Sequence, residues 1–260
     1  MSALAVLNGR AEGQLRYKKP PILEAVLEFR WSEPRPLEAL VSVLRAQAFD
    51  EFEESNPRMQ IDAAVSLDEP KLSHSTKQLG FEASLRDGSQ IVFLEQQKFV
   101  FVQRAPYDRL VSFSADDMSA LHEVTSQLAV DEFSRVGLRY VNRIDIPLGG
   151  NSKINTDDYV TIKFDGPRKD RGIIEEFQMR VVKPTEKEGI HYALVVATTA
   201  SPLTDHSAIL LDIDMFTRPP VPAARDQLDR VLKQMRTEKN EIFQECLTDK
   251  ARDLFGGLDE

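Results

Sequence analysis

Two short stretches of the chain carry closely spaced charged side chains among apolar ones, and the first is "GLRYVNRIDIP" at residues 137–147. On an extended strand its Arg139 and Arg143 share one face, and Arg135, just before it, extends the same row. Asn142 lies on the opposite face. A row of arginines can hold carboxylates or phosphates through paired N–H donors. The stretch is therefore either a binding surface or a strand with ion pairs along one face.

The second stretch is "HSAILLDIDMF" at residues 206–216. Its Asp212 and Asp214 point to one side of a strand among apolar neighbours, where an unpaired charge is costly. Three explanations compete: a divalent-metal site, for which the sequence locates no third acidic ligand; a solvated face; and ion pairs across the sheet. We expect ion pairs, in which Arg139 and Arg143 reach Asp212 and Asp214, with Arg143–Asp214 as the pair to test.

The rest of the sequence offers no constellation for catalysis. The chain has no glycine-rich phosphate loop and no GxSxG motif, and its 4 histidines and 1 cysteine do not form a closed zinc site of the usual kind. Cys246 is expected to be a packed apolar group, and His122 a histidine on a helix surface. The sequence therefore predicts no catalytic residue, no metal and no cofactor, and it favours a protein that is not an enzyme.

Composition narrows the class of protein further. The 260 residues include 42 acidic and 33 basic side chains, a net charge of −9 that disfavours general binding to nucleic acid. Two basic clusters, at 16–21 and 166–171, are interpreted as solvated loops. A single cysteine excludes an intrachain disulfide, and the sequence shows neither a signal-peptide pattern nor the stretch of about 18 apolar residues that spans a bilayer. By elimination we expect a cytoplasmic protein without a membrane segment.

Hydrophobic periodicity predicts the elements that must position these side chains. Alternation predicts strands at 22–31, 59–67, 80–86, 89–96, 99–107, 136–147, 158–165, 173–183, 190–200 and 208–216. Helical spacing predicts helices at 32–54, 114–133, 221–247 and 249–255, the second capped by Ser114 and the last by Thr248.

Runs of strands joined by tight turns favour an α+β fold with mostly antiparallel, curved sheet and packed helices. We expect a flexible arm at 1–19 and two similar helix-on-sheet halves, at 20–132 and 133–260. In element order these halves resemble the helix-grip and TBP-like folds. No linker-like stretch separates the two halves, so we expect one rigid body that shares a continuous sheet.

Four motifs follow one another along the chain: "PPILEAVLEFRW", "GLRYVNRIDIP", "LLDIDMF" and "KNEIFQECLTDKARDLF". In this order they resemble an uncharacterised family of bacterial and archaeal proteins of about this length, which is distributed sporadically. The resemblance runs from about Pro20 to Phe255. It transfers no catalytic residues, because the family has no assigned activity. It implies a cellular setting in which accessory genes, genome defence included, are one option.

These observations predict a non-catalytic interaction or accessory protein of the bacterial cytoplasm, with a protein partner and with homo-oligomerisation left open. The binding candidates are Arg135, Arg139, Asn142, Arg143, Asp212 and Asp214. The alternative is a protein or enzyme that binds a small ligand in a cavity between helix and curved sheet, for which Asn142, Tyr140 and His191 are the polar candidates.

Overall fold

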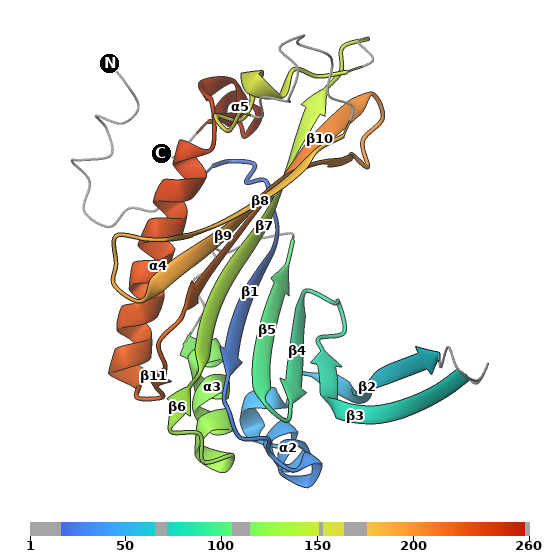
Figure 1. Cartoon of the computed structure of the whole chain (residues 1–260), viewed down its shortest axis with the longest axis vertical. Helices are drawn as coiled ribbons and strands as arrows, with labels where there is room; N and C mark the ends of the chain where they lie inside the picture. Colours follow the sequence, from blue (N-terminus) through green and yellow to red (C-terminus); the bar gives the residue numbers. More distant parts are fainter. Residues whose placement is uncertain (1–16, 66–71, 106–114, 151–152, 164–175, 258–260) are drawn as a thin grey trace.

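A single large sheet organises the molecule (Figure 1). The computed structural model describes residues 17–65, 72–105, 115–150, 153–163 and 176–257. Nine antiparallel strands lie in the order β2-β3-β4-β5-β1-β7-β10-β9-β8, so the predicted α+β class with mostly antiparallel sheet is confirmed. The strands are β1 (Ile22–Arg30), β2 (Glu53–Val65), β3 (Leu72–Ser84), β4 (Gln90–Glu95), β5 (Lys98–Arg104), β7 (Arg135–Pro147), β8 (Gln178–Pro184), β9 (Ile190–Ala200) and β10 (His206–Thr217).

The helices pack on one face of this sheet and share one continuous apolar core with it. They are α2 (Leu37–Leu44), α3 (Ala115–Gln127), α4 (Arg225–Glu245) and α5 (Asp249–Leu254), with short 3-10 turns η1 (Gln47–Phe49) and η2 (Thr156–Asp158). A small second sheet pairs β6 (Glu132–Phe133) with β11 (Val221–Pro222). Thr248 caps α5 as predicted, because its hydroxyl accepts from the Ala251 N–H at 3.3 Å.

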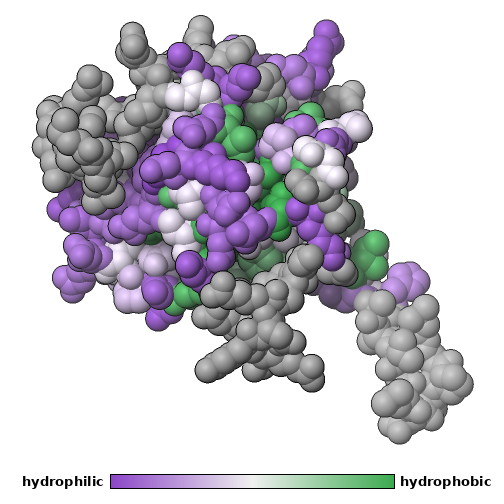
Figure 2. All heavy atoms as spheres, turned by 90° about the horizontal axis from the view of Figure 1, so that it is seen from above, coloured by the Kyte–Doolittle hydropathy of each residue, from purple (hydrophilic) through white to green (hydrophobic). Residues whose placement is uncertain are grey.

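The opposite face of the sheet, here called the open face, carries side chains such as Glu28, Arg139 and Asp212. None of the helices in the described part of the chain joins the small apolar cluster on this side, which is built from strand residues alone. Seen from the end of the molecule that carries α5, the surface is mostly hydrophilic with smaller hydrophobic areas between (Figure 2).

The paired strands β2 and β3 continue beyond the body of the sheet as a two-stranded ribbon (Figure 1). We define the ribbon as residues 55–65 and 72–79. Its described side chains are exposed at almost every position of β2 from Ser55 outward. The ribbon therefore gains little from the core and projects into solvent.

The first predicted helix, 32–54, is wrong in its second half. The helix α2 ends at Leu44, and Phe49 lies in a 3-10 turn where its ring is buried near Phe52 and Phe99. The Phe49 ring packs edge-on against Phe99 of β5, and this contact with the sheet outweighs the helical propensity of the segment. The chain then enters β2 at Glu53, six residues before the predicted strand.

The predicted strand 158–165 is also wrong within its described part. Residues 156–158 form a 3-10 turn, and Val160 makes only an isolated bridge to Leu247. Tyr159 and Val160 are consecutive and both buried, a pattern that alternation cannot represent. The strand predicted at 173–183 begins at Gln178 in the described chain.

Three other boundaries differ from the sequence prediction. The helix predicted at 114–133 ends at Gln127, because Ala129 takes a left-handed φ of 48° that stops it; Ser114 lies outside the described residues. The helix predicted at 221–247 begins at Arg225, after Val221 and Pro222 pair with β6. Of the predicted arm, Tyr17 is buried and its hydroxyl donates to Gln244 at 2.9 Å, so the arm is anchored at this point.

Candidate functional site

The open face is crossed by a row of arginine–carboxylate pairs, and the central pair joins β7 to β10. Arg139 lies opposite Asp214 in register, but its guanidinium reaches diagonally to Asp212. Nε and Nη2 donate to the two carboxylate oxygens of Asp212 at 2.8 and 2.7 Å. This two-pronged geometry is the strong form of the contact. The predicted pairing of Arg139 with a β10 carboxylate is therefore present.

Arg135 extends the row by bridging two strands. Its Nη2 donates to both carboxylate oxygens of Asp214, at 3.0 and 2.9 Å, and its Nη1 donates to Glu28 on β1. Glu28 also accepts two bonds from Arg30, each of 2.9 Å. Gly137 leaves the space for this guanidinium, since a Cβ there would lie 2.2 Å from Arg135 Nη1.

The expected pair Arg143–Asp214 is wrong. Arg143 lies opposite Leu210, and its Nε donates to Asp145 on its own strand at 3.0 Å. Ser201 donates to the same carboxylate at 2.7 Å. Asp145 lies two residues from Arg143 on the same face, so the local partner is closer than any carboxylate on the facing strand.

Partial burial and the hydrogen bonds between partners shift the pKa values of two groups in the row. Burial raises the pKa of Asp214, although its contacts with Arg135 oppose that change. The hydrogen bond to Asp212 raises the pKa of Arg139. The hydrogen bonds hold these groups oriented toward one another, so the row is a set of preformed ion pairs. Asp212 and Asp214 are occupied by arginines, and within the described residues no group of three or more His, Cys, Asp or Glu could hold a metal ion.

An apolar cluster lies beside these pairs on the open face. Ile91, Val100 and Val102 form it, with Val26 and Phe93 packed against it. Arg58 lies over the Phe93 ring at 4.4 Å from its centroid. The apolar cluster and the row of arginine–carboxylate pairs are therefore neighbours on the same face of the sheet.

Asn142 does not belong to the open face. It is buried on the helix side, as its place in the alternation predicts, and its amide donates to the Leu211 carbonyl at 3.0 Å. Tyr140 shares that side, whereas His191 lies on the open face and stacks on Phe216 at 5.8 Å. The three polar candidates for a ligand cavity are therefore not brought together.

Above Tyr140 lies a buried cation that the sequence reasoning missed. The ammonium of Lys239 on α4 sits 3.9 Å from the Tyr140 ring centroid, and the residue is only 9% exposed. Burial, and secondarily the charge of Arg236, lowers the pKa of Lys239 to about 7. Arg236 has a buried Nε without a hydrogen-bond partner. Among the described residues, no carboxylate lies within ion-pair distance of either cation.

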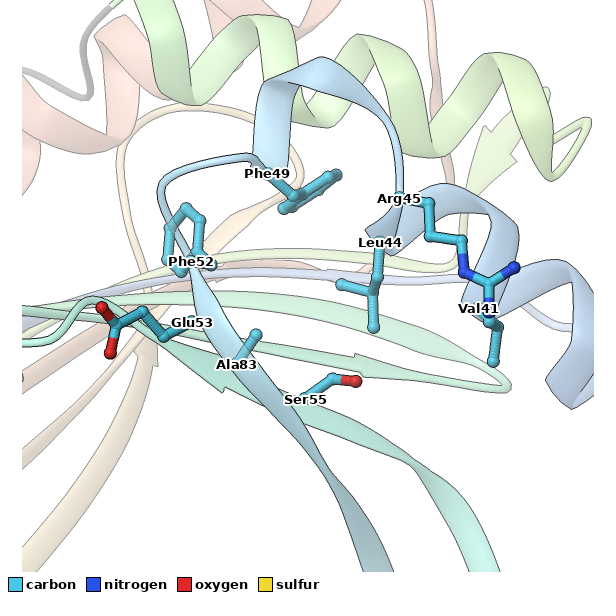
Figure 3. Close-up of a pocket in the computed structure, with 8 residues that line it drawn as sticks. All are labelled: Val41, Leu44, Arg45, Phe49, Phe52, Glu53, Ser55 and Ala83. Carbon is cyan, nitrogen blue, oxygen red and sulfur yellow. The ribbon is translucent and has the colours of Figure 1, made fainter.

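Two pockets in the described part of the chain are lined by residues other than the predicted ligand candidates. One, of about 240 Å³, lies between α2, η1 and the base of the ribbon (Figure 3). Its lining is mixed, with the polar residues Arg45, Glu53 and Ser55 beside the apolar residues Val41, Leu44, Phe49, Phe52 and Ala83. The other, about 530 Å³, is open and runs from Arg30 to Glu95. Neither is lined by Asn142, Tyr140 or His191.

Sequence reasoning found the arginine row but missed Glu28, Arg30 and Asp145. Alternation does place Glu28 on one face of β1, but nothing in the sequence says that β1 is the neighbour of β7. The interpretation of Cys246 as a packed apolar group agrees with its burial, which raises the pKa of its thiol to about 12. His122 is exposed on α3, as predicted.

Comparisons with protein-family models, with curated proteins and with solved structures find no match to this chain. The fold and the site therefore rest on the residues themselves. In the described part of the chain, every helix is too short or too polar to cross a membrane.

Proposed function

We propose that this protein is a non-catalytic interaction protein, whose open face binds a protein partner. One observation carries the proposal: a small apolar cluster, of which Val26 and Phe93 are partly exposed, is bordered by preformed arginine–carboxylate pairs on a sheet face that no described helix covers. Protein–protein interfaces are built in this way, with an apolar centre, a polar rim and arginine in preference to lysine. Arginines fixed by ion pairs also lose little side-chain entropy on binding.

The charges define the kind of partner. Each arginine of the row faces a carboxylate, so the row presents alternating signs and no strong net potential. Together with the net charge of −9, this disfavours nucleic acid. The expected partner is a protein segment with an apolar stripe between acidic and basic side chains, which are selected by complementary charge.

The test uses site-specific photo-crosslinking in cells of the source organism. A crosslinking side chain replaces Thr199, which is exposed on the open face of β9, or Thr237, which is equally exposed on α4. The expected result is one discrete adduct from position 199 and none from position 237, reproduced with the purified partner. Adducts of equal yield from both positions, or none from position 199, would contradict the proposal.

We further infer that the sheet consists of two similar halves in a TBP-like arrangement. Read from edge to centre, one half has the order β2-β3-β4-β5-β1 and the other β8-β9-β10-β7. In each half, the first strand along the chain lies at the centre, the second lies at the outer edge, and the later strands follow inward. A helix, α3 or α4, comes after the last strand of each half within the large sheet. These parallels support the inference, as do the adjacent central strands β1 and β7.

The family resemblance supports a cellular setting for this interaction. A cytoplasmic accessory protein, with genome defence as one context, fits a patchily distributed gene. Co-purification of the open-face adduct with the products of neighbouring genes is the expected outcome. A partner encoded by a conserved housekeeping gene would count against that setting.

A second candidate function rests on Lys239 and Arg236. Two cations without a described anion, one of them buried over an aromatic ring, form a surrounding that suits a carboxylate or phosphate group. Calorimetry with inorganic phosphate and with a short dicarboxylate shows which of these two anions binds. We expect saturable binding that Lys239→Met abolishes and that Arg230→Met, an exposed position on the same helix, leaves unchanged. No heat of binding from either anion would remove this candidate.

A further inference from the structure

The ribbon presents an edge strand that has no neighbour among the described residues. β2 is the outermost strand of the sheet. Two-stranded ribbons are marginally stable in water, and three or more strands are needed for independent stability. Met59 and Ile61, 50% and 70% exposed, lie on one side of β2. A projecting, partly apolar edge of this kind is suited to pairing with another strand.

The sequence of this edge is complementary to itself. From the body outward it reads Arg58, Met59, Gln60, Ile61 and Asp62. When a second copy of the strand runs in the opposite direction, its Asp62 lies opposite Arg58, and its Ile61 lies opposite Met59. Gln60 stays at the centre.

We propose that β2 pairs with the β2 edge of a second copy of this chain, antiparallel and about a two-fold axis at Gln60. In this register Arg58 faces the partner's Asp62, and Met59 faces the partner's Ile61. Opposite residues of antiparallel strands share a face, so the apolar pairs lie on one side and the ion pairs on the other. The two-fold axis makes each contact twice.

The charges select this register over its neighbours. A shift of two residues in either direction moves Arg58 away from the partner's Asp62 and loses both ion pairs. Charges on an edge strand oppose unspecific pairing, and they admit the one partner that satisfies them. In the single chain the Arg58 side chain reaches inward, past β3, to Phe93 and Glu95 of β4, where its Nε lies 3.3 Å from the Glu95 carboxylate, so in the dimer it would turn outward to the partner's Asp62. Pro57 lacks an N–H, so the ladder is interrupted there.

Pairing would turn two marginal ribbons into one of four strands. The sheet would then run from one copy into the next. Because a two-fold axis perpendicular to the sheet preserves its faces, both open faces would lie on the same side. This goes beyond the proposed function, since the dimer edge and the open face are different surfaces.

Disulfide trapping tests the register directly. Gln60→Cys places a thiol at the two-fold axis, whereas Lys77→Cys places one opposite it on β3, which is as exposed but away from the edge. The only native cysteine, Cys246, is buried and gives little background. Under mild oxidation we expect a covalent dimer of Gln60→Cys and little of Lys77→Cys. Equal yields from the two variants, or none from either, would overturn the register.

Charge reversal tests the association in solution. Arg58→Asp and Asp62→Arg each place like charges opposite one another twice, and each should weaken the dimer at least about tenfold in sedimentation equilibrium. The double variant Arg58→Asp/Asp62→Arg exchanges the two signs and should restore it. Circular dichroism checks that each variant is folded. A wild-type chain that stays monomeric up to high concentration, or a double variant as weak as the singles, would overturn the proposal.

Discussion

At the scale of single residues, the Arg139–Asp212 pair is instructive because its partners are unequally exposed. The side chain of Arg139 is 45% exposed and that of Asp212 only 10%. Removal of the arginine therefore leaves a nearly buried carboxylate without its partner. We expect Arg139→Ala to lower the free energy of unfolding by about 1–3 kcal/mol, between the values for exposed and buried pairs. Urea denaturation at pH 7 measures it.

A double-mutant cycle supplies the control. Arg139→Ala with Asp212→Ala should cost less than the sum of the single changes, because the two side chains touch. Arg143→Ala with Asp214→Ala should be additive, since Arg143 bonds to Asp145 instead. Additivity at the first pair, or coupling at the second, would contradict the observed contacts.

Gly137 leaves room on β7 for the guanidinium of Arg135, because it has no Cβ. A Cβ at this position would lie 2.2 Å from Nη1 of Arg135, so Gly137→Ala forces the guanidinium away from Glu28 and Asp214. We expect a loss of about 1–2 kcal/mol in the free energy of unfolding, because charge-assisted bonds are broken. In an Arg135→Ala background the same substitution should cost much less. An equal cost in both backgrounds would mean that the strand itself resists alanine.

At the scale of elements, the packing of α4 on β7 encloses Lys239 and makes stability depend on pH. The pKa of Lys239 is about 7 in the folded chain and ordinarily 10.5, while Tyr140 below it has a pKa of about 12 and Arg236 lies beside it. Between these two pKa values of Lys239 the unfolded chain binds more protons. The free energy of unfolding therefore rises with pH from about 7 to 10.5, and the penalty is complete below pH 7.

Lys239→Met isolates this contribution. The variant should be more stable than the wild type near pH 6, by up to several kcal/mol, since each tenfold change in proton affinity corresponds to about 1.4 kcal/mol. The advantage should shrink steadily and disappear near pH 10.5. Thermal unfolding across this range measures it, with Lys233→Met on the exposed side of α4 as the control. A difference that does not change with pH would show that the ammonium is not desolvated.

The elements also show where periodicity misleads. α4 and β10 were predicted within a few residues, because their apolar stripes meet one core surface for their whole length. Residues 45–54 carry helical spacing too, yet they turn. Phe49 and Phe52 pack near each other and near the sheet, and this tertiary contact outweighs local propensity.

At the scale of the whole molecule, the pairing of β1 with β7 joins the two predicted halves. We expect one cooperative unfolding transition, because the two strands pair in register from Glu24 to Arg30 and lie over one core. Fluorescence of the single tryptophan, Trp31, which is buried in the first half, should follow the same curve as far-UV circular dichroism. Two separate transitions, or two stable fragments cut near residue 133, would show independent halves.

The local sequence pattern was enough to predict the class of fold and the face on which each side chain of β7 lies. Alternation placed Leu138, Tyr140 and Ile144 toward the core and Arg139 and Arg143 away from it, since a strand has a period of two whatever its neighbours. It also predicted that a β10 carboxylate would meet an arginine of β7. These statements depend only on local geometry and on the cost of an unpaired charge.

The tertiary structure alone decided which charges meet. Arg139 takes Asp212 and Arg135 reaches Glu28, because these pairs depend on the order and register of β1, β7 and β10. Arg143 instead bonds to Asp145 within its own strand. The burial of Lys239 depends likewise on how α4 crosses the sheet. A one-dimensional pattern records which way a side chain points, but it does not record which strand lies beside it, and that neighbour sets the ion pair.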